Sequence, residues 1–435
     1  MPVAPAAIPH SCNSAPDKRP NMETQTVPHT PFASTREQAL QRWADFAPAA
    51  TSYARDRNFV KDDGHPAVTR LSPAIRMRLV REPELVTDLL SKHSIESVEK
   101  LAQELYWRGY WKGWLEWHPG VWADYLKRVA SAPETYSEAV LARAREVAEG
   151  RSGVPLMDRF ARELIETGYV HNHARMWWSS FWVHIEGLPW ELGAAWYERH
   201  LLDADAATNT LSWRWVAGLQ TKDKSYLVRR SNLERFADPA LLAETTGLDL
   251  LNDKVVTAVE IEETADLKLA VPQKSDALPT DTNKTGLWLH DEDLSVEHSG
   301  LRELRPAGIV GSSPSIQSAW ASQMRTDYAQ LALADGLARA SKHFGMPSEA
   351  LADASPAALA AWATARGLTH LVALRPFTGR LVLDEFRDTL KEAGVELICQ
   401  RRVWDQTVIS QSQRGFFPYW EVMRKRLAKR QMPLE

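Results

Sequence analysis

The residues best suited to chemistry stand in one short stretch, 201–218, which reads LLDADAATNTLSWRWVAG. Its polar and aromatic members are two aspartates (Asp203, Asp205), an asparagine (Asn209) and two tryptophans (Trp213, Trp215). A buried carboxylate is costly unless it is paired, and an indole can stack on a ligand or transfer an electron as well as fill a core. This mixture favours a binding or redox site over packing alone.

The composition is that of a folded protein with room for two domains. The chain has 435 residues, of which 44% are hydrophobic and 25% charged. Tryptophan is unusually abundant, with 18 residues against 11 Phe and 10 Tyr. Most of these indoles are expected in a helical core, and the remainder as stacking platforms or electron carriers.

Charge and cysteine content narrow the function classes. The formal net charge is −4, so any nucleic-acid contact must use a local basic patch. The two cysteines, Cys12 and Cys399, exclude a disulfide framework or a cysteine zinc site and fit a reducing cytoplasm. His171 and His173 are wrongly spaced for one helix face, so no metal site is expected. No apolar run approaches the ~20 residues of a membrane span.

The pattern along the chain predicts four regions. Residues 1–34, rich in Pro, Ala, Ser and Thr, are expected to be a disordered tail. Residues 35–236 show helical periodicity, with Pro and Gly in the gaps. Residues 237–285 are expected to be a linker with at most one helix. Residues 286–435 alternate strand and helix patterns, which is typical of a small α/β domain with a parallel sheet.

The clearest elements can be given bounds. Ser72 is expected to cap a helix that begins at Pro73. Helices are expected at Val98–Trp117, Pro155–Thr167, Ala174–Ile185, Ile316–Phe344, Ala357–Arg366 and Asp384–Gly394. Strands are expected at Leu368–Leu374 and Val395–Gln400, after a short apolar run at Leu287–His290.

Four separated blocks resemble the FAD-binding domain of the DNA photolyase and cryptochrome family in their order and spacing. They are Tyr53 with TRLSPAIR (69–76), ELYWRGYWKGW (104–114), GYVHNHARM (168–176) and the stretch 201–218. The resemblance extends from about Ser34 to Phe236 and is similar to the class I photolyases of cyclobutane pyrimidine dimers.

The resemblance implies a mainly helical domain that binds FAD. The residues it assigns to the cofactor are Tyr53, Thr69, Arg70, Leu71, Ser72, Arg108, Asn172, Arg175, Asp203, Asp205 and Asn209. An aspartate is expected to pair with Arg175, but its position falls on Ile185, which leaves Glu186 or His184 as substitutes.

The same resemblance implies repair of cyclobutane pyrimidine dimers in UV-damaged DNA, by electron transfer from photoexcited reduced flavin. The catalytic residues it assigns are Glu104, Trp107, Met176, Asn209 and Trp215. Lys222, Lys224, Arg229 and Arg230 are expected to contact DNA phosphates.

Electron transfer to the flavin is assigned to Trp213 followed by Trp190. The third tryptophan of the family chain falls on Val147, so the relay is expected to end early or to leave through Trp177, Trp178 or Trp182.

The order of the domains differs from the family pattern. LWLHDEDLSVEH (287–298) and residues 386–427 are similar to the first strand and the final part of the family's N-terminal α/β domain, which would make the chain a circular permutation. Without a clear set of antenna ligands, the sequence does not predict a second chromophore.

Two other functions stay open at this point. A cryptochrome-like blue-light receptor would bind FAD without repairing DNA and would signal to a protein partner. A flavoprotein without a light function is the third reading, because a fold alone does not fix an activity.

Overall fold

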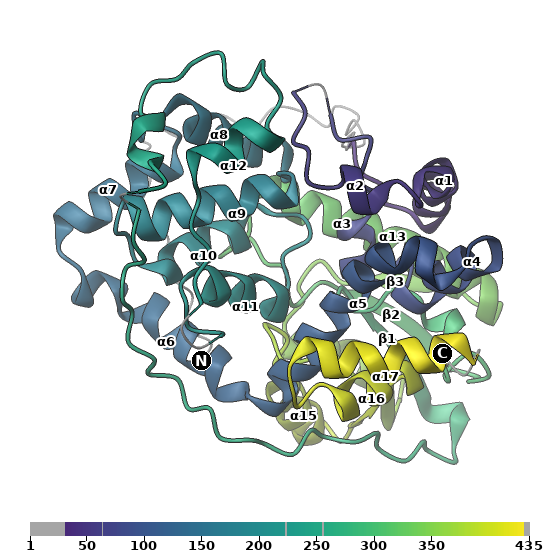
Figure 1. Ribbon diagram of the computed structural model, residues 1–435. Helices are drawn as coiled ribbons and strands as arrows, with labels where there is room; N and C mark the ends of the chain where they lie inside the picture. Colours follow the sequence, from purple (N-terminus) through teal and green to yellow (C-terminus); the bar gives the residue numbers. More distant parts are fainter. Residues whose placement is uncertain (1–30, 63, 222–223, 255, 430–435) are drawn as a thin grey trace, which may run out of the picture.

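The computed structural model describes residues 31–62, 64–221, 224–254 and 256–429. It consists of a helical part and a smaller part built on a five-stranded sheet (Figure 1). The predicted fold class, a mainly helical domain with a smaller C-terminal α/β domain, is therefore confirmed. The predicted tail lies outside the described residues up to position 30, and the predicted domain boundaries stay predictions.

The helical part is made of short and medium helices joined by tight turns. Its helices are α1 (Arg36–Phe46), α2 (Tyr53–Asp56), α3 (Ser72–Arg76), α4 (Glu82–Lys92), α5 (Ile95–Trp117), α6 (Pro119–Thr135), α7 (Glu138–Ala148), α8 (Pro155–Thr167), α9 (Asn172–Ser180), the π-helical turn η2 (Phe181–Ile185), α10 (Trp190–His200), α11 (Ala206–Val216) and α12 (Arg230–Phe236).

The second part holds a parallel sheet in the order β3-β2-β1-β4-β5. Its elements are β1 (Thr285–His290), β2 (Gly308–Ser312), α13 (Gln323–Phe344), β3 (Ser348–Ala350), α14 (Pro356–Ala365), β4 (His370–Leu374), α15 (Leu383–Glu392), β5 (Glu396–Gln400), α16 (Val403–Gln411) and α17 (Phe416–Ala428). In register, Gly286 of β1 lies opposite Gly308 of β2 and Leu371 of β4.

Helices cover both faces of this sheet. Alternate side chains of β1 point to opposite faces, so Leu287 and Leu289 pack toward α13 and the helical part. Trp288 packs on the other face with Phe386 of α15 at a ring distance of 4.8 Å. A sheet covered on both faces explains why every residue of β1 is buried, with an apolar run at its centre.

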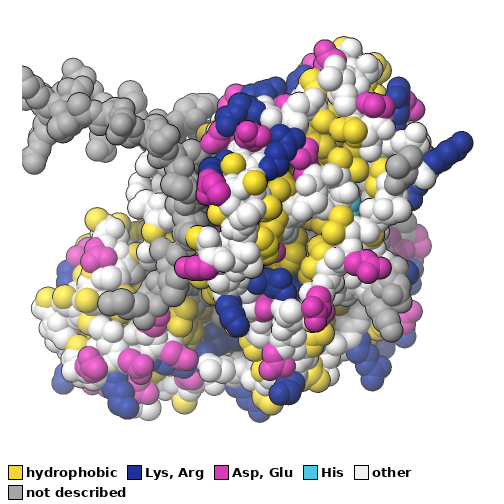
Figure 2. All heavy atoms as spheres, turned by 90° about the vertical axis from the view of Figure 1, so that its left-hand side faces the viewer, with side chains coloured by type: hydrophobic (Ala, Val, Ile, Leu, Met, Phe, Trp, Pro, Cys, Tyr) yellow, Lys and Arg dark blue, Asp and Glu magenta, His cyan; other side chains and the backbone are white. Residues whose placement is uncertain are grey.

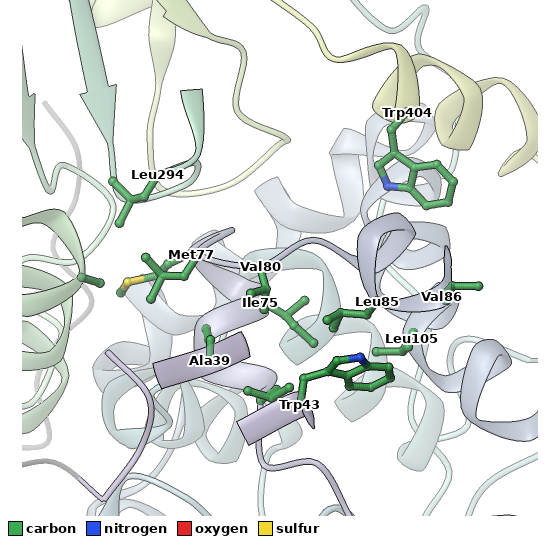
Figure 3. Packing of buried hydrophobic residues seen from close by; sticks show 14 of the residues in the cluster. Ala39, Trp43, Ile75, Met77, Val80, Leu85, Val86, Leu105, Leu294 and Trp404 are labelled. Atoms are coloured by element: carbon green, nitrogen blue, oxygen red, sulfur yellow. The ribbon is translucent and has the colours of Figure 1, made fainter. Parts of the chain in front are cut away.

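One hydrophobic cluster joins the two parts. Leu294 follows β1 and lies beside Met77, whose carbonyl accepts a hydrogen bond from Leu294 N at 3.0 Å (Figure 3). Trp404 of α16 belongs to the same cluster as Leu105 of α5. Because this cluster is continuous, the sheet-bearing part and helices α1 to α5 are expected to unfold together.

Buried ion pairs reinforce the same contact. Asp293 accepts from Arg78 Nη1 at 2.8 Å and from Arg402 Nε at 2.7 Å. Arg78 also pairs with Asp405 of α16 at 2.6 Å. All four side chains are buried, so each charge depends on its partners.

The C-terminal helices return to the helical part. Helices α16 and α17 pack along α5, as the yellow helices beside the dark blue one show in Figure 1. Tyr106 of α5 has ring contacts with Trp404 and Trp420, which fixes both helices on one side of α5.

The segment between the two parts is mostly extended. It contains the 3-10 turn η3 (Leu248–Leu251) and then runs along the surface, where Ala270 N donates to Trp117 O at 2.8 Å. Among the described residues, no helix is long and apolar enough to cross a membrane.

Candidate functional site

The two aspartates of the segment 201–218 lie at the start of α11 and are both buried. Asp205 is the N-cap residue of α11, and its Oδ1 accepts a hydrogen bond from Thr208 N at 2.8 Å. A carboxylate at a helix N-terminus is favoured by the N–H groups that have no partner inside the helix. The preference for aspartate at the N-cap of a helix therefore explains the position of Asp205. Asp203, two residues earlier, is buried beside it.

Arg175 of α9 pairs with Asp203. Its Nη1 lies 3.0 Å from Oδ1 and 3.1 Å from Oδ2. Burial alone would raise the pKa of Asp203, but the charges of Arg175 and Arg108 and a hydrogen bond from Ser72 hold that pKa below its usual value. Asp203 is therefore a buried anion with a fixed cation beside it.

The substitutes expected for the partner of Arg175 are wrong. Glu186 pairs with Arg143 at 2.8 Å, and His184 contacts Val216 O and Val259 N. The acceptor is Asp203, 28 positions along the chain, which the order of residues could not show.

Arg108 connects α5 to the same centre, because its guanidinium pairs with Asp205. Thr208 Oγ1 also donates to Asp205 Oδ2 at 2.7 Å. Burial would raise the pKa of Asp205, but the nearby charges of Lys112 and Arg108 and the hydrogen bonds from Thr208 lower it. The pairs Arg175–Asp203 and Arg108–Asp205 therefore lie together where α5, α9 and α11 meet.

The loop before α3 reaches this centre, but not as a helix cap. The expected capping role of Ser72 is wrong, because Leu71 is the N-cap residue of α3 and Ser72 is the first helical residue. The Ser72 side chain instead lies near Asp203 and helps to lower the pKa of that carboxylate. Arg70 has a φ of 54°, in the left-handed region that non-glycine residues seldom adopt. A local conformation of this kind is kept when the surroundings require it.

Thr69 and Leu71 close the loop: Thr69 Oγ1 accepts from Leu71 N at 3.2 Å. Tyr53 of α2 is half-buried, and burial raises the pKa of its hydroxyl. The tyrosine is therefore a neutral donor at physiological pH.

The two asparagines differ in their surroundings. Asn209 is buried on α11, and its amide donates to Ala194 O at 2.8 Å. Asn172 is exposed at the start of α9, with its amide 4.0 Å from the sulfur of Met176 one turn later.

Glu104 and Trp107 lie three positions apart on α5. The carboxylate of Glu104 is 3.0 Å from both Arg57 and Lys100. The Trp107 ring stacks on Phe416 of α17 with 3.5 Å between centroids and 8° between planes. Trp107 remains half-buried, so part of the indole still reaches the surface.

Trp215 of α11 is also half-buried, and its ring stacks on Tyr226 at 5.5 Å. The Tyr226 hydroxyl lies 3.4 Å from His173 Nε2, and His173 Nδ1 is 2.8 Å from Asn58 O. Since Arg57 precedes Asn58 and pairs with Glu104, this loop connects the Trp215 surface with Glu104.

Comparison with known proteins finds similarity in the same region of the chain. The sequence profile described as the FAD binding domain of DNA photolyase matches residues 101–246. The deoxyribodipyrimidine photo-lyase of Streptomyces griseus is 34% identical over 37% of this chain and 35% of its own length. The cryptochrome DASH of Vibrio parahaemolyticus is 27% identical over 44% of this chain and 42% of its own length. The region 101–246 of this chain is therefore similar to the FAD-binding domain of the photolyase and cryptochrome family.

The shared region is limited in length. The chain covers less than half of the length of these photolyase and cryptochrome relatives. Among solved structures, a cryptochrome from Synechocystis sp. PCC6803 matches 55% of this chain and 52% of its own, at 21% identity and a TM-score of 0.39.

The tryptophans of this photolyase-like region form a buried cluster around Trp213. Its ring neighbours are Tyr197 at 5.1 Å, Trp178 at 6.2 Å and Trp182 at 6.4 Å. The ring of Trp190 contacts Tyr125 at 5.9 Å. Of the three exits expected from sequence, the structure therefore brings Trp178 and Trp182 to Trp213. Trp177 contacts His173 instead, and Val147 is buried in α7.

The basic residues expected on the DNA side follow α11. Lys224 and Arg230 are exposed, Arg229 is half-buried, and Lys222 lies outside the described residues. Arg229 Nη1 donates to Asp253 O at 2.9 Å, and Arg230 pairs with Glu234. On the face drawn in Figure 2, Lys and Arg side chains are interspersed with Asp and Glu.

Two residues that contact the candidate site residues, Arg57 and Phe416, were not predicted from the sequence. Arg57 stands four residues after Tyr53, and that helical spacing could have pointed to it. Phe416 gave no signal, because it is 309 positions from the ring on which it stacks. The histidines add no metal centre: in the part of the chain that the structure describes, no three His, Cys, Asp or Glu side chains gather as metal ligands.

Proposed function

We propose that this protein binds FAD in its helical part and, as a photolyase-like lyase, uses light to split cyclobutane pyrimidine dimers in DNA. One observation supports this most strongly. On α5, Arg108 pairs with Asp205 in the buried charge centre, and Glu104 lies one turn earlier, toward the surface. In this proposal, α5 would contact the cofactor through Arg108 and the substrate through Glu104.

The residues present fit FAD. Asp203 and Asp205 offer buried acceptors for N–H and hydroxyl groups, and Asn209 offers an amide. Arg70 Nε is buried and has no hydrogen-bond partner within the described residues, which suits an anion beside the loop 69–72. Tyr53, Arg108, Asn172 and Arg175 complete the proposed cradle. Bound FAD would supply the light absorption and the transferred electron.

The substrate side offers two half-buried indole surfaces and a carboxylate. A dimer must leave the duplex to be repaired, and a flipped base is held by aromatic stacking and a few hydrogen bonds. Phe416 behind Trp107 and Tyr226 behind Trp215 would fix the two indoles, with Met176 nearby as an adaptable apolar contact. Glu104 would accept or donate one hydrogen bond to the lesion.

DNA binding would rest on Lys222, Lys224, Arg229 and Arg230. Phosphate contacts release counterions, so affinity should fall as salt rises. Arg229→Ala with Arg230→Ala should weaken binding to damaged and undamaged DNA alike, because phosphates are the same in both.

A cryptochrome-like light receptor without repair, acting on a protein partner, is the second candidate. It is favoured by the contacts that Glu104 and Trp107 already make inside the chain. Glu104 is held by two cations, and one face of Trp107 is taken by Phe416. A dimer would have to compete for that carboxylate.

The deciding experiment illuminates the FAD-loaded, chemically reduced protein with an oligonucleotide that contains one dimer, and measures loss of the dimer. Repair should require light, and Glu104→Gln should lower repair per photon more than DNA affinity. Glu96→Gln is the matched control on α5, since the ion-pair partner of Glu96 among the described residues is Arg424 of α17. No loss of dimer at saturating DNA would reject repair and favour the receptor.

A further inference from the structure

We propose that electrons reach the flavin site along Trp213, Trp178 and Trp196, and not through Trp190. This route rests on the proposed FAD binding, and it names the residues that would supply the electron. It also departs from the pair Trp213 and Trp190 expected from sequence.

Ring geometry gives a continuous path from the site to the edge of α10. The rings of Trp213 and Trp178 are 6.2 Å apart in a T-shaped contact, and those of Trp178 and Trp196 are 4.6 Å apart and stacked within 26°. Trp213 lies one turn after Asn209 on the same face of α11. The path therefore begins beside the proposed cofactor and has no gap between rings.

Trp190 is poorly placed for the same task. The guanidinium carbon of Arg214 lies over its ring, 5.9 Å from the centroid. A cation at that distance is attracted to a neutral indole and repels the positive charge that the indole would gain on losing an electron. Arg214 is buried and its guanidinium pairs with Glu263, which offsets part of this repulsion, and water screens the remainder little.

The other two rings that contact Trp213, those of Trp182 and Tyr197, are poor steps in the route. Trp182 contacts Trp178 and Trp213 and is fully buried, so it is a side branch of the route. Tyr197 must release its proton to be oxidised, but its hydroxyl donates to the carbonyl of Arg175, which is a weak base, and burial raises its pKa.

The route is expected to end at Trp196, because an oxidised indole can lose its proton there. Within the described residues, the indole N–H groups of Trp213 and Trp178 are buried and have no acceptor, so each ring keeps its proton when it loses an electron. One electron then passes from Trp178 to Trp213 and one from Trp196 to Trp178. Trp196 is 6% exposed, and its ring is 5.6 Å from that of His200. There the indole proton can pass to water, and a soluble thiol can return the electron.

The test compares four tryptophan variants of the FAD-loaded protein under blue light with a thiol reductant. Trp178→Phe should slow flavin reduction about tenfold, or ~1.4 kcal/mol of barrier. Trp196→Phe should shorten the life of the transient tryptophan radical by a similar factor. Trp190→Phe and Trp177→Phe should match the parent. Trp177 is the matched control, since it is equally buried but its N–H bonds to Asn232.

A readout without cofactor checks the path in the same variants. Two indoles stacked at 4.6 Å are expected to give a coupled signal in the near-UV circular dichroism of the apoprotein. Trp178→Phe and Trp196→Phe should each reduce it, because the pair of Trp107 and Trp111 at 5.2 Å remains in both, and Trp190→Phe should leave it unchanged. Trp178→Tyr is a second, less disruptive variant if the phenylalanine variant does not fold.

The outcomes separate the route from the function. Loss of photoreduction in Trp190→Phe with retention in Trp178→Phe overturns the route and leaves FAD binding intact. Absence of the coupled signal in the parent apoprotein also overturns the route. A parent that takes up FAD but is not photoreduced overturns the route alone, because repair is tested with chemically reduced flavin. A parent that takes up no FAD overturns the proposed function and the route together.

Discussion

Arg175 and Asp203 form a two-point ion pair in the interior, with Nη1 of the arginine 3.0 Å from one carboxylate oxygen and 3.1 Å from the other. The pair joins α9 to the segment before α11 and lies next to Ser72 of α3. Removing either charge would leave the other buried without compensation. The pair is therefore expected to govern both local stability and the binding of a cofactor.

Asp203→Asn should destabilise the protein by ~3–5 kcal/mol, the usual cost of breaking a buried pair on one side. Urea unfolding at neutral pH measures this. Glu138→Gln is the control, because this glutamate pairs with Arg145 on α7 and its side chain is 78% exposed. Equal stability of Asp203→Asn and the parent would show that the pair is not a structural element.

The same pair sets a dependence on pH. The pKa of Asp203 is lower in the folded protein than its ordinary value of 3.8. The unfolded chain therefore binds the proton first, and the stabilisation is fully present above about pH 4 and is lost as the pH falls through the lowered pKa. Acid titration of the unfolding free energy should show this loss in the parent and a smaller one in Asp203→Asn.

Gly193→Ala should displace the ring of Trp213. A Cβ at position 193 would lie 2.2 Å from Cη2 and 2.6 Å from Cζ3 of that indole. Overpacking of this kind costs ~1–3 kcal/mol, and a shifted Trp213 should also slow photoreduction. Gly300→Ala, which meets nothing within 4 Å, is the control. If Gly193→Ala is photoreduced as fast as the parent, Trp213 is not the indole that passes the electron to the flavin.

Asp293→Asn tests the junction of the two parts. It would leave Arg78 with half of its pairing and Arg402 with none of its carboxylate contacts, at a cost of ~3–5 kcal/mol. Helical circular dichroism and the total tryptophan fluorescence should lose signal in one transition in the parent. Asp388→Asn, exposed on α15, should have no effect. Two separate transitions in the parent would contradict a shared core.

Local rules made parts of this structure predictable. Helix α8 has the predicted bounds, because Pro155 fits a first helical turn and Gly168, with a φ of 68°, fits the end. The helix predicted from Ile316 begins only at Gln323, after the cap Ser322. Strands β2 and β3 were missed, since one is a short run with two glycines and the other is a three-residue edge strand.

Contacts between distant segments could not be predicted in this way. The order of residues identified Asp203, Asp205 and Trp213 as unusual, but it did not show that Arg175 meets Asp203. It also could not show that the ring of Trp178 contacts that of Trp213. Such pairings depend on how α9, α10 and α11 pack, and packing is set by the whole core.

The binding of FAD at the Arg175 and Asp203 centre is tested most directly by the flavin content of the purified protein. The parent, mixed with FAD and passed through a desalting column, should retain stoichiometric flavin. Asp203→Ala with Asp205→Ala should retain almost none, because ligand N–H and hydroxyl groups would lose their buried acceptors. Stoichiometric flavin in that double variant, or none in the parent at saturating FAD, would contradict the proposed cradle.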